Sequence, residues 1–269
     1  MIRKLANTPM VQRFKKYGKR GAAISVLCIA SLALAADDAS GPVDRFKPAL
    51  DHLQSLTILN LPDWRFHDDV RHPEDPSLND SGWDSIGIDK LWSSGARVFR
   101  RWIQVPETFN GYAVRGARLT LDLTIESNGP LSISVFSNGS MVYHGNQEMQ
   151  QPILLTENAS PGERFLLAVR VDAQPVPTRI ASSRLVLQPP PNRPDPALLR
   201  DEMLAAQPMV AAYPESASEH RQQLDAALAA IDFSSLDRGD QAGFDESLRR
   251  VQGKLDVLKP WMKQFSSVT

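Results

Sequence analysis

The stretch ARLTLDLTI, residues 117–125, decides the fold class, because apolar and polar side chains alternate along it. Leucine or isoleucine occupies every second position from 119 to 125. Alternate side chains of an extended strand point to opposite faces, so the pattern predicts a strand with one buried and one wet face. Residues 131–135 (LSISV) repeat the alternation, which favours an antiparallel sheet.

Other apolar segments between residues 56 and 188 are equally short, and turn residues separate them. They include LTILNL, DWRFH, VFRRWIQV, QPILLT, RFLLAVRVD and SRLVLQ. The turn signals are Asn128-Gly129-Pro130, Asn138-Gly139 and Ser160-Pro161-Gly162. About nine short strands without a long helix predict a mainly β domain over 56–188, an antiparallel sandwich of jelly-roll type.

The segment RRWIQVPETFNG, residues 100–111, reads as a strand that breaks into a polar corner. The corner contains Pro106, which cannot donate to a strand ladder. We expect Arg100 or Arg101 to hold a loop in place. Glu107 is expected to cap the corner or to pair with one of these arginines.

A proline-rich linker, residues 189–196, ends the β domain, and the pattern after it is helical over residues 197–269. The first predicted helix reaches about Tyr213, disturbed by Pro208, and a second opens at Ser216. A third is expected over 240–259. Its apolar positions step by four and three residues, as in the seam of a helical hairpin: Phe244, Leu248, Val251, Leu255, Leu258 and Met262.

Residues 1–35 have the features of a signal peptide. They carry seven basic residues and no acid, then an apolar run at 22–35 that ends in Ala33-Leu34-Ala35. The run is short for a membrane span, although an uncleaved anchor is the alternative. We therefore expect export to a periplasmic or extracellular location, with no membrane contact after cleavage. Residues 36–55 form a polar lead-in with a short amphipathic piece.

Removal of that peptide would leave 23 basic and 31 acidic residues and no cysteine, because Cys28 lies within it. A disulfide framework and a thiolate metal site are thereby excluded. An acidic chain without a basic tract also argues against nucleic acid as a partner.

The candidate ligand-binding residues are four tryptophans that could stack on sugar rings: Trp64, Trp83, Trp92 and Trp102. Core packing is the commoner role of tryptophan and stays open as the alternative. The polar segment from His67 to Asp75 matches no zinc spacing, so a solvated loop is favoured, with a structural calcium ion as the next alternative. No nucleophile elbow or phosphate-binding glycine loop is present.

Several motifs together resemble a known family of domains. They are DWRF, DSGWDSI, FRRWIQVPETFNG, VFSNGSMVYHGN and ILLTENASPGERFLLAVRVDA. This set is similar to the sugar-binding-type jelly roll, a galactose-binding-domain-like sandwich, that precedes the catalytic domain of many glycoside hydrolases. The resemblance implies that Asn138-Gly139 makes a tight hairpin turn and that Trp102 fills the sandwich.

The helical part narrows the resemblance. PPPNRPDPALLRDEMLAAQ, AALAAIDFSSLDRGDQAGFDESL and LKPWMKQF resemble the N-terminal region of bacterial α-mannosidases of glycoside hydrolase family 38. Such enzymes use an Asp nucleophile and a zinc ion held by His and Asp of a following domain, which begins near a Gly-His-x-His segment. This chain has no such segment, so no catalytic residue and no metal site can be assigned within it, and zinc is implied only for the absent domain.

The sequence therefore predicts a non-catalytic accessory region of an exported α-mannosidase-like enzyme, cut before its catalytic domain. Its partner would be that domain or a glycan. A free-standing periplasmic carbohydrate-binding module and a structural docking protein are the alternatives. The oligomeric state stays open.

Overall fold

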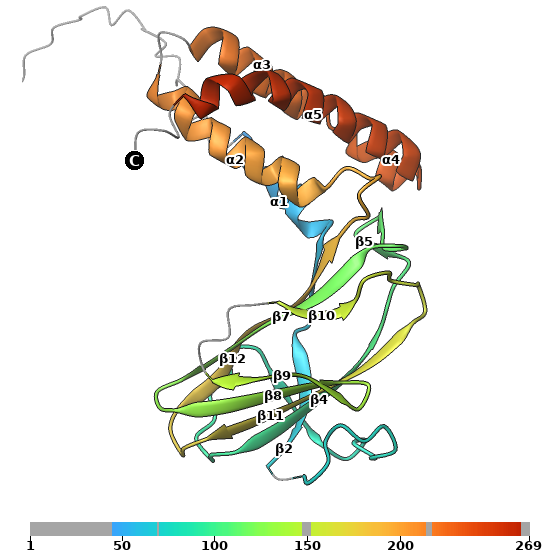
Figure 1. The fold of residues 1–269 in the computed structure, drawn as a ribbon, viewed down its shortest axis with the longest axis vertical. Coiled ribbons are helices and arrows are strands. Elements are labelled where there is room, and N and C mark those ends of the chain that lie inside the picture. Colours follow the sequence, from blue (N-terminus) through green and yellow to red (C-terminus); the bar gives the residue numbers. More distant parts are fainter. Residues whose placement is uncertain (1–44, 69, 147–151, 214–216, 265–269) are drawn as a thin grey trace, which may run out of the picture. The chain divides into compact units, whose positions relative to one another are not determined.

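The computed structural model describes residues 45–68, 70–146, 152–213 and 217–264. The predicted signal peptide lies outside these ranges. The described chain is a β-sandwich of two antiparallel sheets followed by a group of helices, which confirms the predicted fold class (Figure 1).

The sandwich has a four-stranded and a six-stranded sheet. The first has the order β1 (Ile58–Asn60), β12 (Thr178–Gln188), β7 (Arg118–Ser127) and β10 (Ile153–Thr156). The second has the order β3 (Asp84–Gly87), β2 (Asp63–His67), β4 (Arg97–Gln104), β11 (Arg164–Ala173), β8 (Leu131–Ser137) and β9 (Ser140–Asn146). Strands β5 (Thr108–Phe109) and β6 (Tyr112–Ala113) form a small separate ribbon.

The core lies between the sheets, where the alternation of the sequence places apolar side chains. The leucines of β7 are buried in turn, and Leu119 and Leu121 have no exposed surface. Trp64 of β2 reaches across the core and donates its indole N–H to Ser183 Oγ of β12 at 3.1 Å. A buried indole thereby keeps a hydrogen-bond partner.

The turn between β8 and β9 is made by Asn138 and Gly139, whose φ angles are 48° and 85°. Positive φ at both central residues is the requirement of a type I′ hairpin turn, and Asn-Gly meets it at the lowest steric cost. Asn138 Oδ1 also accepts the backbone N–H of Leu166 at 2.8 Å, so the turn is bound to β11.

The helices are α1 (Lys47–Ser55), α2 (Pro196–Ala212), α3 (Ala217–Ala229), α4 (Phe233–Asp237) and α5 (Gln241–Lys263). Asp195 caps α2 by accepting from Ala197 N at 2.9 Å, and Pro196 occupies its first turn. The predicted seam of α5 is confirmed: five of its six positions are at most 2% exposed, and Met262 is partly buried. Helix α5 continues past Pro260 for most of a turn, where the sequence predicted an end at Lys259.

Helix α1 precedes the first strand in the chain, yet it packs against α2, which follows the last strand. Its buried side chains Leu50 and Leu53 belong to the apolar core. His52 stacks on Phe233 of α4, with ring centroids 4.1 Å apart. The helical part is therefore built from segments on both sides of the sandwich in sequence. Within the described ranges, no helix combines the length and hydropathy needed to cross a membrane.

Candidate functional site

A polar pocket of about 390 Å³ lies against the edge of the six-stranded sheet formed by β3, β2 and β4. The residues that matter for its chemistry are Asp63, Arg65, Asp80, Arg100, Arg101 and Trp102. We call it the Trp102 pocket. Its lining contains three arginines, two aspartates, Ser85 and two tryptophans, of which Trp64 is buried and Trp102 is exposed. Such a set suits a polar ligand that carries a flat apolar face.

Strand register explains why these residues meet. Arg65 of β2 lies opposite Arg100 of β4 and opposite Ser85 of β3. Alternate residues of a strand share a face, so Asp63 and Trp102 project on the same side as the paired arginines. That side is the outer face of the sheet, since Trp64 between them points into the core.

Arg100 is fully buried in this outer face, beneath the loop 70–83. It donates to Leu78 O at 2.8 Å and to Asp75 O at 3.0 Å, and Trp83 lies 5.7 Å from its guanidinium carbon. Its Nε has no hydrogen-bond partner among the described residues. The side chain thus holds the loop that forms one wall of the pocket.

Asp80 of this loop lies between two arginines. Its carboxylate is 3.6 Å from Arg100 Nη1 and 3.9 Å from Arg65 Nη1. Arg65 also donates to the backbone carbonyl of Asp80 at 2.5 Å. The negative charge of Asp80 is therefore already balanced within the protein.

Arg101 has a different environment. It donates to the backbone carbonyl of Asp63, and in the described part of the chain no carboxylate lies within ion-pair distance of it. Burial, partly offset by the charge of Asp63, lowers the pKa of Arg101. A carbonyl carries only a partial charge, so this guanidinium is half-desolvated without a full counter-charge.

Trp102 is 42% exposed, which corrects the expectation that it fills the sandwich. The reason is strand parity: its neighbours Phe99 and Ile103 occupy inward positions, whereas Trp102 shares the outward parity of Arg100. The guanidinium carbon of Arg164, on β11, lies 4.7 Å from the centroid of the Trp102 ring.

The other predicted residues are placed differently. Trp64 and Trp92 are 1% and 5% exposed, so their rings present no face to a ligand, and the sugar-stacking hypothesis does not apply to them. Trp83 is half-buried against Arg100. Glu107 is exposed and, within the described ranges, pairs with neither Arg100 nor Arg101. That pairing prediction is wrong because loop and strand carbonyls bind both guanidinium groups.

Among the residues that the structure describes, no group of three or more His, Cys, Asp or Glu side chains could hold a metal ion. In the polar loop, His72 Nδ1 lies 3.2 Å from Glu74 Oε1; the His72 side chain is exposed and that of Glu74 is partly buried. Sequence reasoning missed Arg65, Asp80 and Arg164. The sequence pattern indicates that Arg65 faces outward. It does not indicate the strand register that brings Arg65, Asp80 and Arg164 toward one pocket.

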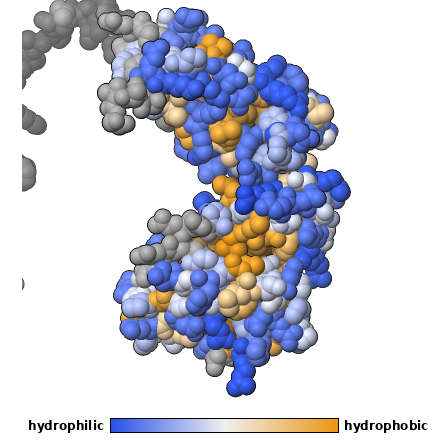
Figure 2. Space-filling model, in the orientation of Figure 1, coloured by the Kyte–Doolittle hydropathy of each residue, from blue (hydrophilic) through white to orange (hydrophobic). Residues whose placement is uncertain are grey.

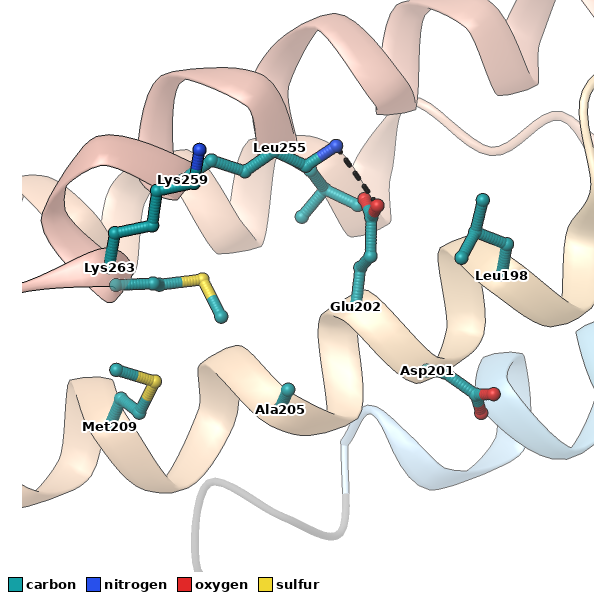
Figure 3. Close-up of a pocket in the computed structure, with 9 residues that line it drawn as sticks. Leu198, Asp201, Glu202, Ala205, Met209, Leu255, Lys259 and Lys263 are labelled. Carbon is teal, nitrogen blue, oxygen red and sulfur yellow. Dashed lines mark ion pairs between the residues drawn. The ribbon is translucent and has the colours of Figure 1, made fainter. Parts of the chain in front are cut away.

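A second concave surface lies between α2 and α5, an apolar groove of about 680 Å³. Leu198, Met209 and Leu255 line it, and Figure 3 shows Glu202 directed across it toward Lys259, 2.9 Å away, whereas Asp201 points aside. Figure 2 shows apolar surface in this region of the helical part. The groove has few polar groups and offers no catalytic set.

No protein-family model matches the sequence, and no curated protein matches at a significant level. Similar solved structures include a glycosyl hydrolase family 2 member from Bacteroides cellulosilyticus, with TM-score 0.40 and 18% identity over 50% of this chain and 21% of that chain. A β-glucuronidase from Bacteroides uniformis has TM-score 0.38 and 18% identity, over 49% of this chain and 18% of that one. A Ruminococcus gnavus β-glucuronidase in complex with D-glucuronic acid has TM-score 0.37 and 11% identity, over 50% and 30%.

These neighbours are glycoside hydrolases, and this chain spans between 18% and 30% of their length. At such identities and TM-scores the likeness is too distant to assign an activity. The resemblance to family 38 α-mannosidases therefore stays a prediction from the sequence.

Proposed function

We propose that this chain is a non-catalytic accessory region of an exported glycoside hydrolase and that its β-sandwich binds carbohydrate at the Trp102 pocket. The observation that carries the proposal is the position of Trp102, an exposed indole at the rim of a pocket of charged hydrogen-bonding side chains. A sugar ring has an apolar face of C–H groups and an equatorial rim of hydroxyls. An indole beside arginine and aspartate side chains matches both features.

The remaining parts of the proposal rest on the sequence. The basic and apolar segments of residues 1–35 support export, and the motif resemblance supports an α-mannosidase-like parent with its zinc-dependent catalytic domain beyond this chain. In this proposal the sandwich supplies binding, and hydrolysis belongs to the following domain. A glycan and that domain are then the partners.

Binding should be measured by isothermal titration calorimetry with a panel of oligosaccharides, on the chain and on Trp102→Ala. We expect saturable binding that falls at least about tenfold in the variant, since stacking on an aromatic ring and the contacts around it account for roughly 1.4 kcal/mol or more. Trp92→Phe, a buried position, is the matched control and should bind normally once folding is verified. Binding that is equal in Trp102→Ala would refute this site.

Catalysis is tested separately with nitrophenyl glycosides, including the α-mannoside. No turnover above the uncatalysed rate is expected from the chain alone. Turnover that survives purification and is lost on unfolding would contradict the non-catalytic assignment. The docking-protein alternative would use the groove between α2 and α5, but nothing in that groove specifies an occupant, so carbohydrate binding is favoured.

A further inference from the structure

Resting on the proposed function, we infer that the Trp102 pocket selects anionic sugars, in which a carboxylate or a sulfate group is attached to the ring, over neutral ones. The chemistry common to both groups is a compact set of anionic oxygens beside a pyranose ring. Three observations carry the inference: the charge balance of the pocket, the lack, among the described residues, of a carboxylate at ion-pair distance from Arg101, and the position of Arg164.

The charge balance of the pocket is positive. Arg65, Arg100 and Arg101 line it together with only two aspartates, Asp63 and Asp80. Asp80 lies within 4 Å of two of the arginines, so its charge is shared between them. The three arginines therefore exceed the two aspartates by one positive charge, and Arg101 is the one without a carboxylate at ion-pair distance in the described part of the chain, although the charge of Asp63 still acts on it.

Arg101 is positioned to bind an anion. The structure shows one of its N–H groups donating to Asp63 O, and a guanidinium carries five such donors. The planar fork of arginine matches two oxygens of a carboxylate or sulfate. A neutral hydroxyl in the same place would leave the partly desolvated charge without a counter-charge.

Arg164 extends the positive surface along the rim. Its guanidinium lies over the Trp102 ring at 4.7 Å, and the described residues contain no carboxylate within ion-pair distance of it. Arg101 and Trp102 have opposite strand parity but line the same pocket, so an anionic group on a sugar at Trp102 would approach Arg164 at the rim and Arg101 at the pocket wall. The indole would then hold the ring while the two guanidinium groups select its charge.

The test compares matched ligands. Affinities for trigalacturonate, for carboxyl-reduced trigalacturonate and for a sulfated galactose oligosaccharide would be measured by calorimetry, with inorganic sulfate as a separate probe. We expect the charged trisaccharide to bind at least about tenfold more tightly than its reduced counterpart, and the difference to shrink as salt is raised. The sulfated ligand distinguishes a general preference for anions from one for carboxylates.

Variants assign the effect to residues. Arg164 is exposed, so Arg164→Gln should fold normally. We expect this variant to lose several-fold more affinity for anionic ligands than for neutral ones. Arg101→Lys keeps the charge but removes the fork and should give an intermediate loss, larger in Arg101→Gln. Arg118→Gln, on the other sheet, is the control.

The possible outcomes separate the two proposals. Equal, Trp102-dependent binding of charged and reduced trisaccharides would overturn the anionic inference and leave the proposed function in place. No Trp102-dependent binding of any oligosaccharide would overturn both. Binding of inorganic sulfate alone, without any sugar ligand, would also count against both, since the ring would then contribute nothing.

Discussion

Arg193 and Asp245 form an ion pair, with 3.3 Å between Nε and Oδ2. The pair joins the proline-rich segment to α5. Their side chains are only 14% and 10% exposed. Arg193 also donates to Ala113 O at 2.9 Å and lies over the ring of Tyr112 at 4.3 Å. One guanidinium thus joins the β5–β6 ribbon, the proline-rich segment and α5.

Replacement of Asp245 by alanine should lower the free energy of unfolding by about 3 kcal/mol, because a nearly buried arginine loses its counter-charge. Urea unfolding measures this. Glu246→Ala is the adjacent control: its pair with Arg249 is exposed, and a change within about 1 kcal/mol is expected. Equal effects of the two substitutions would mean that burial does not strengthen the Arg193–Asp245 pair.

Because Tyr112 is buried, we expect the stability of the folded protein to depend on pH in the alkaline range. Burial raises its pKa well above the ordinary value of a tyrosine. The unfolded chain therefore releases this proton first, from about pH 10, and folded-state stability falls by about 1.4 kcal/mol per pH unit above that point until the folded pKa is reached. Below the unfolded pKa there is no effect, since both states are protonated.

The check on this prediction is Tyr112→Phe, which removes the titration together with the hydrogen bond from the hydroxyl to Pro194 O at 2.7 Å. The variant should be less stable than the parent at pH 8, and the two stabilities should converge as pH rises past 10. Parallel curves through pH 11 would contradict the raised pKa.

Arg100→Met should lower the free energy of unfolding by about 3 kcal/mol, since two charge-assisted hydrogen bonds to loop carbonyls are lost. We also expect faster proteolytic cleavage within the loop 70–83, mapped by mass spectrometry. Arg65→Met is the comparison, because Arg65 is exposed and pairs only at the surface, for which about 1 kcal/mol or less is expected. Unchanged cleavage of the loop would show that Arg100 does not hold it.

Asp195 caps α2, and burial raises the pKa of its carboxyl. Ionisation at neutral pH therefore costs the folded state more than the unfolded one. Asp195→Asn keeps an oxygen for Ala197 N and avoids that cost. Its stability relative to the parent should therefore rise as pH increases above about 4 and level off once the folded-state carboxyl is ionised. Asp195→Ala removes the cap and should lose about 1 kcal/mol in thermal or urea unfolding. An asparagine variant with the same pH profile as the parent would contradict the shift.

Local patterns were sufficient to predict most of the strands and the helices α2, α3 and α5. The alternation in β7 and the four-three steps in α5 each express a period that the backbone imposes, so a short window of sequence contains the information. The packing of α1 against α2 has no such signal, because it depends on chain segments separated by the whole sandwich. The two-residue strands β5 and β6 are too short to show a period.

The pocket was predictable only in part. Trp102, Arg100 and Arg101 were noticed, but the sequence could not show that Trp102 faces outward, since strand parity is fixed by the neighbours that fill the core. Arg100 is buried only because a loop about twenty residues earlier supplies carbonyl partners. Asp80 and Arg164 come from separate elements, and their approach to β4 depends on register rather than on any local motif.

The packing of α1 against later helices also affects the order in which parts of the protein can fold during synthesis. The contact between Arg45, at its N-terminal side, and Asp225 of α3 spans 180 positions. At ribosomal rates of about 5–20 residues per second, the apolar face of α1 waits on the order of ten seconds or more for its partners. Closure of so long a chain segment is also slow by its own entropy. The helical part is thus the last to become complete, and a chain halted within the sandwich would leave Leu50 and Leu53 exposed as a target for chaperones and proteases.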